Sequence, residues 1–362
     1  MGHAAADEPN DPADVAAPEV STASVAPVVP ATGATPIAAV GAGRMGRGIA
    51  IAFAYAGHRI VLIDIKRRSA EATSRLRDEA QTEIAQSLGG LLQLGVITSQ
   101  QSDQIAARIQ FTAADGAAAA LAHAELVFEG VPETMEAKRE AFAQLSTWCR
   151  PDAILASTTS SLRASALAAL VIGPERFLNI HWLNPAYVIP VVELSTHAGT
   201  APAVLARARA ILQGIGKLPV VCGDTPGYIV PRLQALIMNE AARMIEEGAA
   251  SAEDIDTATR FGLGLRFAAL GVVEFIDFGG ADILHHASRE MSQSISAARY
   301  TAPAVIGQMM AAGQLGLKTG SGFYDHSGRD VAAYRSDVLG RVLGQLKHAG
   351  LWRGPADDTA HG

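Results

Sequence analysis

Three features of this 362-residue sequence predict an α/β fold with a parallel sheet, followed by an all-helical domain. A glycine-rich turn separates two short apolar runs near residue 40. Short apolar runs then alternate with helical runs as far as residue 222, and after Asp224-Thr225-Pro226-Gly227 only helical spacing continues. Such alternation is typical of a parallel sheet covered by helices. The strand candidates are residues 37–40, 60–63, 126–128, 154–157, 177–181 and 219–222.

The first of these runs leads into Gly41-Ala42-Gly43-Arg44-Met45-Gly46, which is followed by a helical run. In a turn of this kind the first glycine permits a tight bend and the second lets the backbone approach a pyrophosphate. The third lets the helix pack close to the sheet, and free N–H groups at the helix start hold the phosphate charge. The spacing therefore predicts a Rossmann-type dinucleotide-binding domain.

Asp64 ends the second apolar run, 23 positions after Gly41. An acid here would accept hydrogen bonds from the adenosine ribose hydroxyls and would repel a ribose 2′-phosphate. We therefore expect NAD to be favoured over NADP. Lys66, Arg67 and Arg68 follow at once and weaken that preference.

Beyond this turn the sequence predicts two further organisational features. Residues 69–108 read as a mostly helical pair inserted beside the cofactor cleft, broken at Gly89-Gly90 and at Gly95. Residues 232–247 have helical spacing that ends at Gly248, Ser251 can cap the next helix, and Thr301 can cap a helix over 302–312. The predicted domains are a disordered Ala/Pro-rich tail (1–35), an NAD-binding Rossmann domain (36–222) and a helical domain for substrate and dimerisation (223–350).

Composition excludes several classes of function. A net charge of −7 argues against a nucleic-acid partner, because a phosphate backbone needs clustered Lys and Arg. No apolar run approaches the roughly 20 residues that span a bilayer, so no membrane partner is expected. The only cysteines, Cys149 and Cys222, have no metal-ligand spacing, so we expect no metal site and a reducing compartment. The first 35 residues contain no Lys or Arg, unlike a secretory or mitochondrial leader, and a cytoplasmic enzyme is expected.

Four polar clusters follow predicted strands, at residues 129–138, 157–161, 181–193 and 224–232. The carboxyl ends of parallel strands meet at one edge of a sheet, which is where ligands bind. Histidine has the ordinary pKa best suited to proton transfer near neutral pH, which makes His181 the candidate base. Glu193, twelve residues later, can return beside it and fix its tautomer. The pair suits oxidation of an alcohol, with the hydroxyl proton going to His181 and the hydride to a nicotinamide.

Each of these side chains also has an ordinary structural role. Taken alone, His181 could be a histidine whose hydrogen bonds serve only the fold, and Glu193 could be a solvent-exposed carboxylate. Ser160 and its neighbour fit a helix cap, and Asn184-Pro185 fits a simple turn.

From residue 36 to about residue 325 the chain resembles the 3-hydroxyacyl-CoA dehydrogenase family, including its 3-hydroxybutyryl-CoA dehydrogenases. The resemblance rests on several segments that occur in the family's order. They are GAGRMGRGIA (41–50), STTSSL (157–162), HWLNP (181–185) with Glu193, DTPGYIV (224–230) and GLKTGSGFYD (316–325).

The resemblance implies a role for each matching residue. His181 would be the acid/base and Glu193 its orienting partner. Ser160 would bind the substrate oxygen near the nicotinamide, and Asn184 would fix the nicotinamide and the active geometry. NAD contacts are implied for Gly41, Ala42, Gly43, Arg44, Met45, Gly46, Asp64, Glu133, Lys138, Ser160, Asn184 and Lys318. Family members are dimers through the helical domain, which implies a homodimer here.

Three departures from the family pattern bear on the substrate. Thr158 and Pro231 stand where the family has asparagines, the second of which is a substrate-site residue, and no Lys or Arg lies between Arg77 and Arg108. Acyl-CoA members place a basic residue in that insertion, so an uncharged face there would bind CoA phosphates poorly.

The segment around His181 and GLGLRFAALG (262–271) resemble members that oxidise free hydroxy acids. Those are L-gulonate 3-dehydrogenase of the lambda-crystallin group, carnitine dehydrogenase and a pyridine-carboxylate alcohol dehydrogenase. Arg266 is then a candidate for holding a substrate carboxylate, although a surface or interface ion pair explains it equally well.

Three readings of function follow. The first is NAD-dependent oxidation of a 3-hydroxyacyl substrate of the 3-hydroxybutyryl-CoA type, and the second is the same chemistry on a free 3-hydroxy acid. The third is a non-catalytic, crystallin-like protein, which would not need the four residues Ser160, His181, Asn184 and Glu193 together.

Overall fold

The computed structural model describes residues 36–354, so the predicted N-terminal tail lies outside the described residues. Within them the chain divides into two compact units, residues 36–238 and 239–354. The division falls inside one helix, α8 (Val230–Glu246). None of the described helices combines the length and the apolar character that crossing a bilayer demands.

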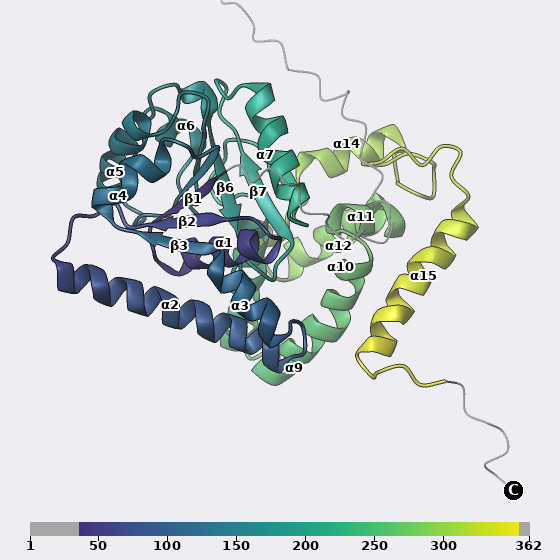
Figure 1. Cartoon of the computed structure of the whole chain (residues 1–362). Helices are drawn as coiled ribbons and strands as arrows, with labels where there is room; N and C mark the ends of the chain where they lie inside the picture. Colours follow the sequence, from purple (N-terminus) through teal and green to yellow (C-terminus); the bar gives the residue numbers. More distant parts are fainter. Residues whose placement is uncertain (1–35, 355–362) are drawn as a thin grey trace, which may run out of the picture. The chain divides into compact units, whose positions relative to one another are not determined.

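The first unit is built on an eight-stranded sheet in the order β3-β2-β1-β4-β5-β6-β7-β8. Figure 1 labels β1, β2, β3, β6 and β7 of this sheet. The first six strands run parallel, β7 turns back antiparallel to β6, and β8 runs parallel to β7. This confirms the predicted α/β fold. The strands are β1 (Ile37–Val40), β2 (Ile60–Ile63), β3 (Ile109–Thr112), β4 (Leu126–Glu129), β5 (Ile154–Ser157), β6 (Phe177–Trp182), β7 (Val191–Ser195) and β8 (Leu218–Cys222).

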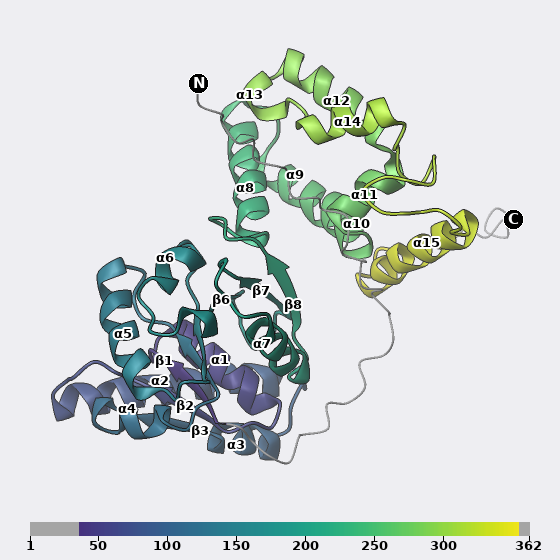
Figure 2. The ribbon, with the colours of Figure 1, turned by 90° about the horizontal axis from the view of Figure 1, so that it is seen from above.

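Helices cover both faces of this sheet because its strands bury both of their faces. Along β1, Ile37 and Ala39 join one buried apolar cluster, and Ala38 and Val40 join the other. Figure 2 shows α4 and α5 on one side of the sheet and α1 and α7 on the other. The first cluster is covered by α1 (Arg44–Tyr55), α2 (Ala70–Gln93), α3 (Ser99–Ala107) and α7 (Pro202–Gly214). The second is covered by α4 (Ala114–Leu121), α5 (Met135–Trp148) and α6 (Ala164–Ala168), and a short 3₁₀ turn, η1 (Pro174–Arg176), precedes β6.

The helical insertion differs from its prediction at one point. Gly89-Gly90 does not break α2, which runs on to Gln93, and the chain turns at Gly95 with φ 69°. Glycine costs a helix only about 1 kcal/mol relative to alanine, and Ile84 and Leu88 hold this part of α2 against the core.

The second unit is helical, as predicted, and is drawn in green and yellow in Figure 1. Ser251 caps α9 by accepting a hydrogen bond from Asp254 N at 3.1 Å. Thr301 does not cap the helix that follows it, because α14 begins after Pro303 and the Thr301 hydroxyl donates back to Ala297 O. The elements after α8 are α9 (Ala252–Thr257), the π-helical η2 (Ala258–Gly264), α10 (Leu265–Ala269), α11 (Val272–Gly279), α12 (Ala281–Ser294), α13 (Ala297–Tyr300), α14 (Ala304–Ala312) and α15 (Val331–His348).

Candidate active site

The glycine turn between β1 and α1 has the geometry of a pyrophosphate cradle. Gly41 adopts φ 102°, and a Cβ there would lie 2.5 Å from Gly130 O. A Cβ on Gly46 would lie 2.0 Å from Gly41 O, so the helix could not pack as it does. Nothing lies within 4 Å of a Cβ placed on Gly43, and no side chain caps α1 at this residue. The open space in front of Gly43 and the free N–H groups of α1 therefore fit a bound pyrophosphate.

Asp64 lies directly after β2 and is 6% exposed. Its carboxylate accepts hydrogen bonds from Arg68 Nε at 2.6 Å and from Lys66 N at 3.3 Å. Asp64 therefore lies where a ribose-binding carboxylate is expected after a Gly41–Gly46 turn. Its negative charge, however, is already balanced by the Arg68 guanidinium.

His181 and Glu193 lie opposite each other because β6 and β7 pair in antiparallel register. His181 Nδ1 lies 2.8 Å from Glu193 Oε2, and Glu193 Oε1 accepts from Ile229 N at 2.9 Å and from Val230 N at 2.8 Å. Burial alone would raise the pKa of Glu193, but these hydrogen bonds outweigh it and hold the pKa below its usual range. The carboxylate is thus ionised at neutral pH, and it holds the proton of the imidazole on Nδ1.

Tyr228 is a site residue that sequence reasoning missed. Its ring stacks on His181 with centroids 4.7 Å apart and planes 5° from parallel. Its hydroxyl donates to Thr159 O at 2.8 Å and accepts from Asn179 Nδ2 at 3.1 Å. Burial raises the pKa of the phenol, so the hydroxyl stays protonated. The one signal in the sequence was an aromatic residue following Gly227 in the DTPGYIV segment.

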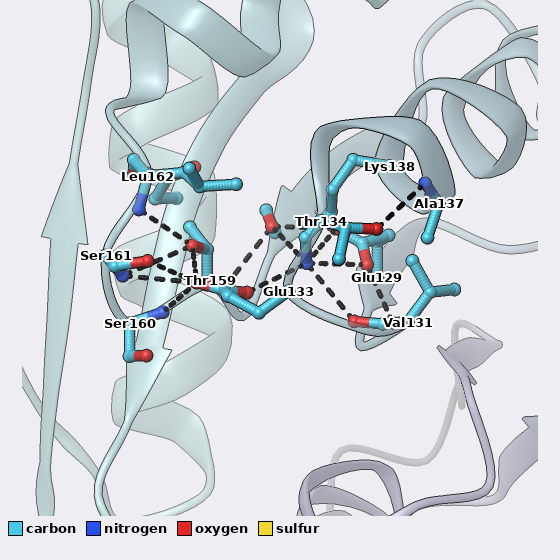
Figure 3. A network of polar contacts seen from close by, with 12 residues as sticks. Glu129, Val131, Glu133, Thr134, Ala137, Lys138, Thr159, Ser160, Ser161 and Leu162 are labelled. Atoms are coloured by element: carbon cyan, nitrogen blue, oxygen red, sulfur yellow. Dashed lines mark hydrogen bonds and ion pairs between the residues drawn. The ribbon is translucent and has the colours of Figure 1, made fainter.

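Glu133 clamps the loop that follows β5 (Figure 3). One of its carboxylate oxygens accepts from the Thr159 hydroxyl, from Ser160 N at 3.0 Å and from Ser161 at both its N (3.2 Å) and its hydroxyl (2.9 Å). Burial alone would raise the pKa of Glu133, but the Thr159 hydrogen bond, the charge of Lys138 and the serine contacts hold it below its usual range. Figure 3 shows the Ser160 hydroxyl pointing out of this network. The clamp therefore fixes the backbone of Ser160 and leaves its side chain free to bind a ligand.

Lys138 is buried beneath the Glu133 contacts and is not exposed to solvent. Its ammonium group lies 2.9 and 3.0 Å from the two oxygens of Glu129 and 3.4 Å from Glu133. Lys138 is 1% exposed and Glu129 is 0% exposed, and Ser157 donates to Glu129 at 2.7 Å. The structure thus makes Lys138 part of a buried ion pair that supports Glu133. Its direct contact with NAD stays a prediction.

Three other predicted site residues take no part in these hydrogen bonds and ion pairs. Asn184 is exposed in the turn after β6. Lys318 belongs to the second unit, where it pairs with Asp282 at 2.8 Å. Arg266, also in the second unit, donates to Gly262 O at 2.8 Å and lies over the Phe275 ring. Across residues 36–354, no three His, Cys, Asp or Glu side chains are grouped to hold a metal ion.

Comparison with known proteins gives matches along most of the chain. The NAD-binding domain of 3-hydroxyacyl-CoA dehydrogenase matches residues 36–225, and the C-terminal domain of the same family matches residues 227–326.

Alignments with individual relatives extend over nearly the whole length of those proteins. The 5-formyl-3-hydroxy-2-methylpyridine 4-carboxylate 5-dehydrogenase of Mesorhizobium japonicum is 31% identical over 85% of this chain and 96% of its own. A 3-hydroxybutyryl-CoA dehydrogenase of Mycobacterium tuberculosis is 34% identical over 80% of this chain and 98% of its own. Among solved structures, a 3-hydroxyacyl-CoA dehydrogenase of Archaeoglobus fulgidus aligns with a TM-score of 0.68 at 29% identity, covering 88% of this chain and all of its own.

Proposed function

Because the chain belongs to the 3-hydroxyacyl-CoA dehydrogenase family, we propose that it oxidises the hydroxyl of a 3-hydroxyacyl substrate to the 3-keto product with His181 as general base. The coarser function follows from the family itself: the chain is an NAD-dependent oxidoreductase acting on a CH–OH group. The observation that carries the proposal is the buried His181–Glu193 pair, at hydrogen-bond distance in the same unit as the glycine cradle.

The side chains divide the chemistry between them. With Nδ1–H held by Glu193, Nε2 presents its lone pair, and it has no hydrogen-bond partner within residues 36–354. Nε2 would take the hydroxyl proton of the substrate, and Glu193 would stabilise the imidazolium that forms. The Ser160 hydroxyl would donate to the substrate oxygen. NAD, when bound, accepts the hydride from the carbinol carbon.

Replacing Glu193 with glutamine is expected to lower the oxidation rate at least about 100-fold. Glutamine can still accept hydrogen bonds from Ile229 N and Val230 N, but it carries no negative charge to stabilise the imidazolium that forms when Nε2 takes the substrate proton. The kcat for NADH formation measures this loss, and the Kd for NAD should be unchanged. A Glu193→Gln variant with the kcat of wild type would contradict the orienting role.

The leading substrate class is a CoA thioester of the 3-hydroxybutyryl type, in keeping with the relatives named 3-hydroxybutyryl-CoA dehydrogenase. A free hydroxy acid is the second candidate, and particular residues favour it. Pro231 has no side chain that donates a hydrogen bond, and the insertion carries no Lys or Arg between Arg77 and Arg108. The Mesorhizobium relative is named for a carboxylate that is not a thioester.

NADH formation, followed by absorbance with purified protein and NAD, distinguishes these candidates. The substrates are L-3-hydroxybutyryl-CoA, free L-3-hydroxybutyrate, L-gulonate and L-carnitine. Activity on the thioester alone supports the first candidate, and activity on a free acid alone supports the second. Absence of NADH with every hydroxy substrate, from protein that binds NAD, would contradict the proposed function.

We also propose a homodimer that buries the apolar side of α8. Leu233, Leu236, Ile237 and Ile245 are 43 to 65% exposed along this amphipathic helix. Helix faces of this kind are covered in stable proteins, and a second copy of the chain is the occupant that the family resemblance implies.

Leu236→Asp is therefore expected to convert the dimer to monomer. The substitution places a carboxylate in a buried apolar contact twice per symmetric dimer, which weakens association by at least about 100-fold. Leu94→Asp, at an exposed leucine on the α2–α3 turn, is the matched control and should stay dimeric. Light scattering after size exclusion measures both, and a monomeric wild-type chain would overturn the proposal.

The location we propose is the cytoplasm. Cys149 and Cys222 are both free thiols, which suits a reducing compartment.

A further inference from the structure

A hollow of about 770 Å³ lies just beyond the ends of β2 and β3. Lys66, Arg67 and Arg68 line it from the segment after Asp64, and Arg77 lines it from the N-terminal part of α2. Ala113 to Asp115 close the side that follows β3. We call this feature the basic hollow. Its volume falls in the range of about 300–1,000 Å³ that is usual for ligand pockets.

Most of the cations around the basic hollow have no anionic partner. Arg68 pairs with Asp64, but no carboxylate among residues 36–354 lies within ion-pair distance of Lys66, Arg67 or Arg77. The Arg77 guanidinium lies over the Phe111 ring, 5.4 Å from its centroid. Asp115 is the one carboxylate on the wall, and its Oδ1 accepts from Gly116 N at 3.0 Å. A concave surface with several unpaired cations is built to attract a multiply charged anion.

We propose that the basic hollow binds a phosphate on the 2′-oxygen of the adenosine ribose, so that this chain accepts NADP as well as NAD. The proposal rests on the dinucleotide site and does not depend on which hydroxy substrate is oxidised. Asp64 is the group that meets the ribose hydroxyls, and the hollow begins two residues after it. A substituent on the ribose would therefore extend past Asp64 toward Lys66, Arg67 and Arg77.

Asp64 does not prevent this, because its charge is already balanced. Arg68 Nε lies 2.6 Å from Asp64 Oδ2, and the Lys66 amide also points at this carboxylate. A phosphate arriving beside Asp64 meets an ion pair and three further cations, not an isolated carboxylate. The repulsion expected from the sequence is offset at this point.

A CoA substrate also carries a phosphate on its adenosine ribose, on the 3′-oxygen, and the basic hollow would attract it in the same way. The location of the hollow beside Asp64 shows which of the two phosphates it serves. The Gly41–Gly46 turn and Asp64 hold the adenosine half of the dinucleotide, which must stay bound while the hydroxy substrate reacts. A CoA adenosine could not occupy the same ribose position during turnover. The basic hollow therefore serves the dinucleotide.

Calorimetric titration of the full chain with five probes tests this assignment. They are 5′-AMP, adenosine 2′,5′-bisphosphate, adenosine 3′,5′-bisphosphate, NAD and NADP. We expect the 2′,5′-bisphosphate to bind at least about tenfold more tightly than 5′-AMP. One additional hydrogen bond between the 2′-phosphate and a charged side chain is enough to give a gain of this size. The Kd for NADP should lie within about tenfold of that for NAD and should rise more steeply with salt.

Variants identify the residues responsible. Arg67→Gln with Arg77→Gln should raise the Kd for NADP at least about tenfold and change that for NAD less than about twofold. Arg75→Gln is the matched control, because Arg75 lies on the same helix but lines a different hollow among Asp78, Glu79 and Glu83. It should leave both cofactors unchanged.

Three outcomes would overturn the proposal. They are a 2′,5′-bisphosphate that binds no better than 5′-AMP, a 3′,5′-bisphosphate that binds best of the three, and equal losses of NAD and NADP in the double variant. Since the readout is binding, a chain that takes NADP but oxidises no hydroxy substrate would contradict the proposed function and leave this site standing.

Discussion

Replacing His181 with asparagine is expected to lower turnover at least about 1,000-fold while leaving the Kd for NAD within about twofold of wild type. Asparagine keeps a hydrogen-bond donor for the buried Glu193 carboxylate, so the fold around the pair should persist. It has no group that takes a proton near neutral pH. Chemistry is therefore lost while the glycine cradle, which lies on other strands and loops, is untouched.

Stopped-flow NADH formation and calorimetric NAD titration on the same preparation separate these two effects. A melting temperature close to wild type would show that the stacked Tyr228 ring and the β6–β7 pairing have survived. Normal turnover in His181→Asn would remove the mechanism, whatever happens to cofactor affinity.

The parts of this site that sequence predicts well are those whose geometry is set locally. The Gly41 to Gly46 turn is one continuous segment with a fixed sequence of conformations, so its spacing alone indicates what it can hold. His181 and Glu193 are twelve residues apart, and an antiparallel return of the chain makes them neighbours across one pair of strands.

The parts that sequence does not reveal depend on packing between distant segments. Two strands were not predicted: β3 is a half-exposed edge strand, and a carboxylate interrupts the apolar pattern of β7. That carboxylate, Glu193, is fully buried, and its hydrogen bonds come from Ile229 N and Val230 N at the start of α8. A lysine on an amphipathic helix looks solvated in sequence, yet Lys138 is enclosed by Glu129 from a neighbouring strand. Burial of charge is a property of the assembled fold, and pattern alone does not report it.

Replacing Lys138 with methionine is expected to lower the free energy of unfolding by about 3–5 kcal/mol, the usual cost of stranding one member of a buried ion pair. Glu129 would keep hydrogen bonds from Ser157 and from Val131 N, but no cation would balance its charge. Glu133 would lose its only salt-bridge partner within residues 36–354, and the loop that presents Ser160 would loosen. Urea denaturation followed by circular dichroism measures the first effect, and KM for the hydroxy substrate reports the second.

The double variant Glu129→Gln with Lys138→Met distinguishes a charge effect from a packing effect. If the stranded charge is what destabilises the single variant, removing both charges restores much of the stability, since a buried pair contributes little net free energy compared with neutral groups of similar size. Arg150→Met, which breaks the exposed Arg150–Asp152 pair, is the control and should unfold like wild type. A single variant as stable as this control would mean that the Glu129 charge does not depend on Lys138, and an unchanged KM would mean that Glu133 holds the Ser160 loop unaided. A double variant no more stable than the single one would instead assign the loss of stability to the shape of the lysine stem and not to the stranded charge.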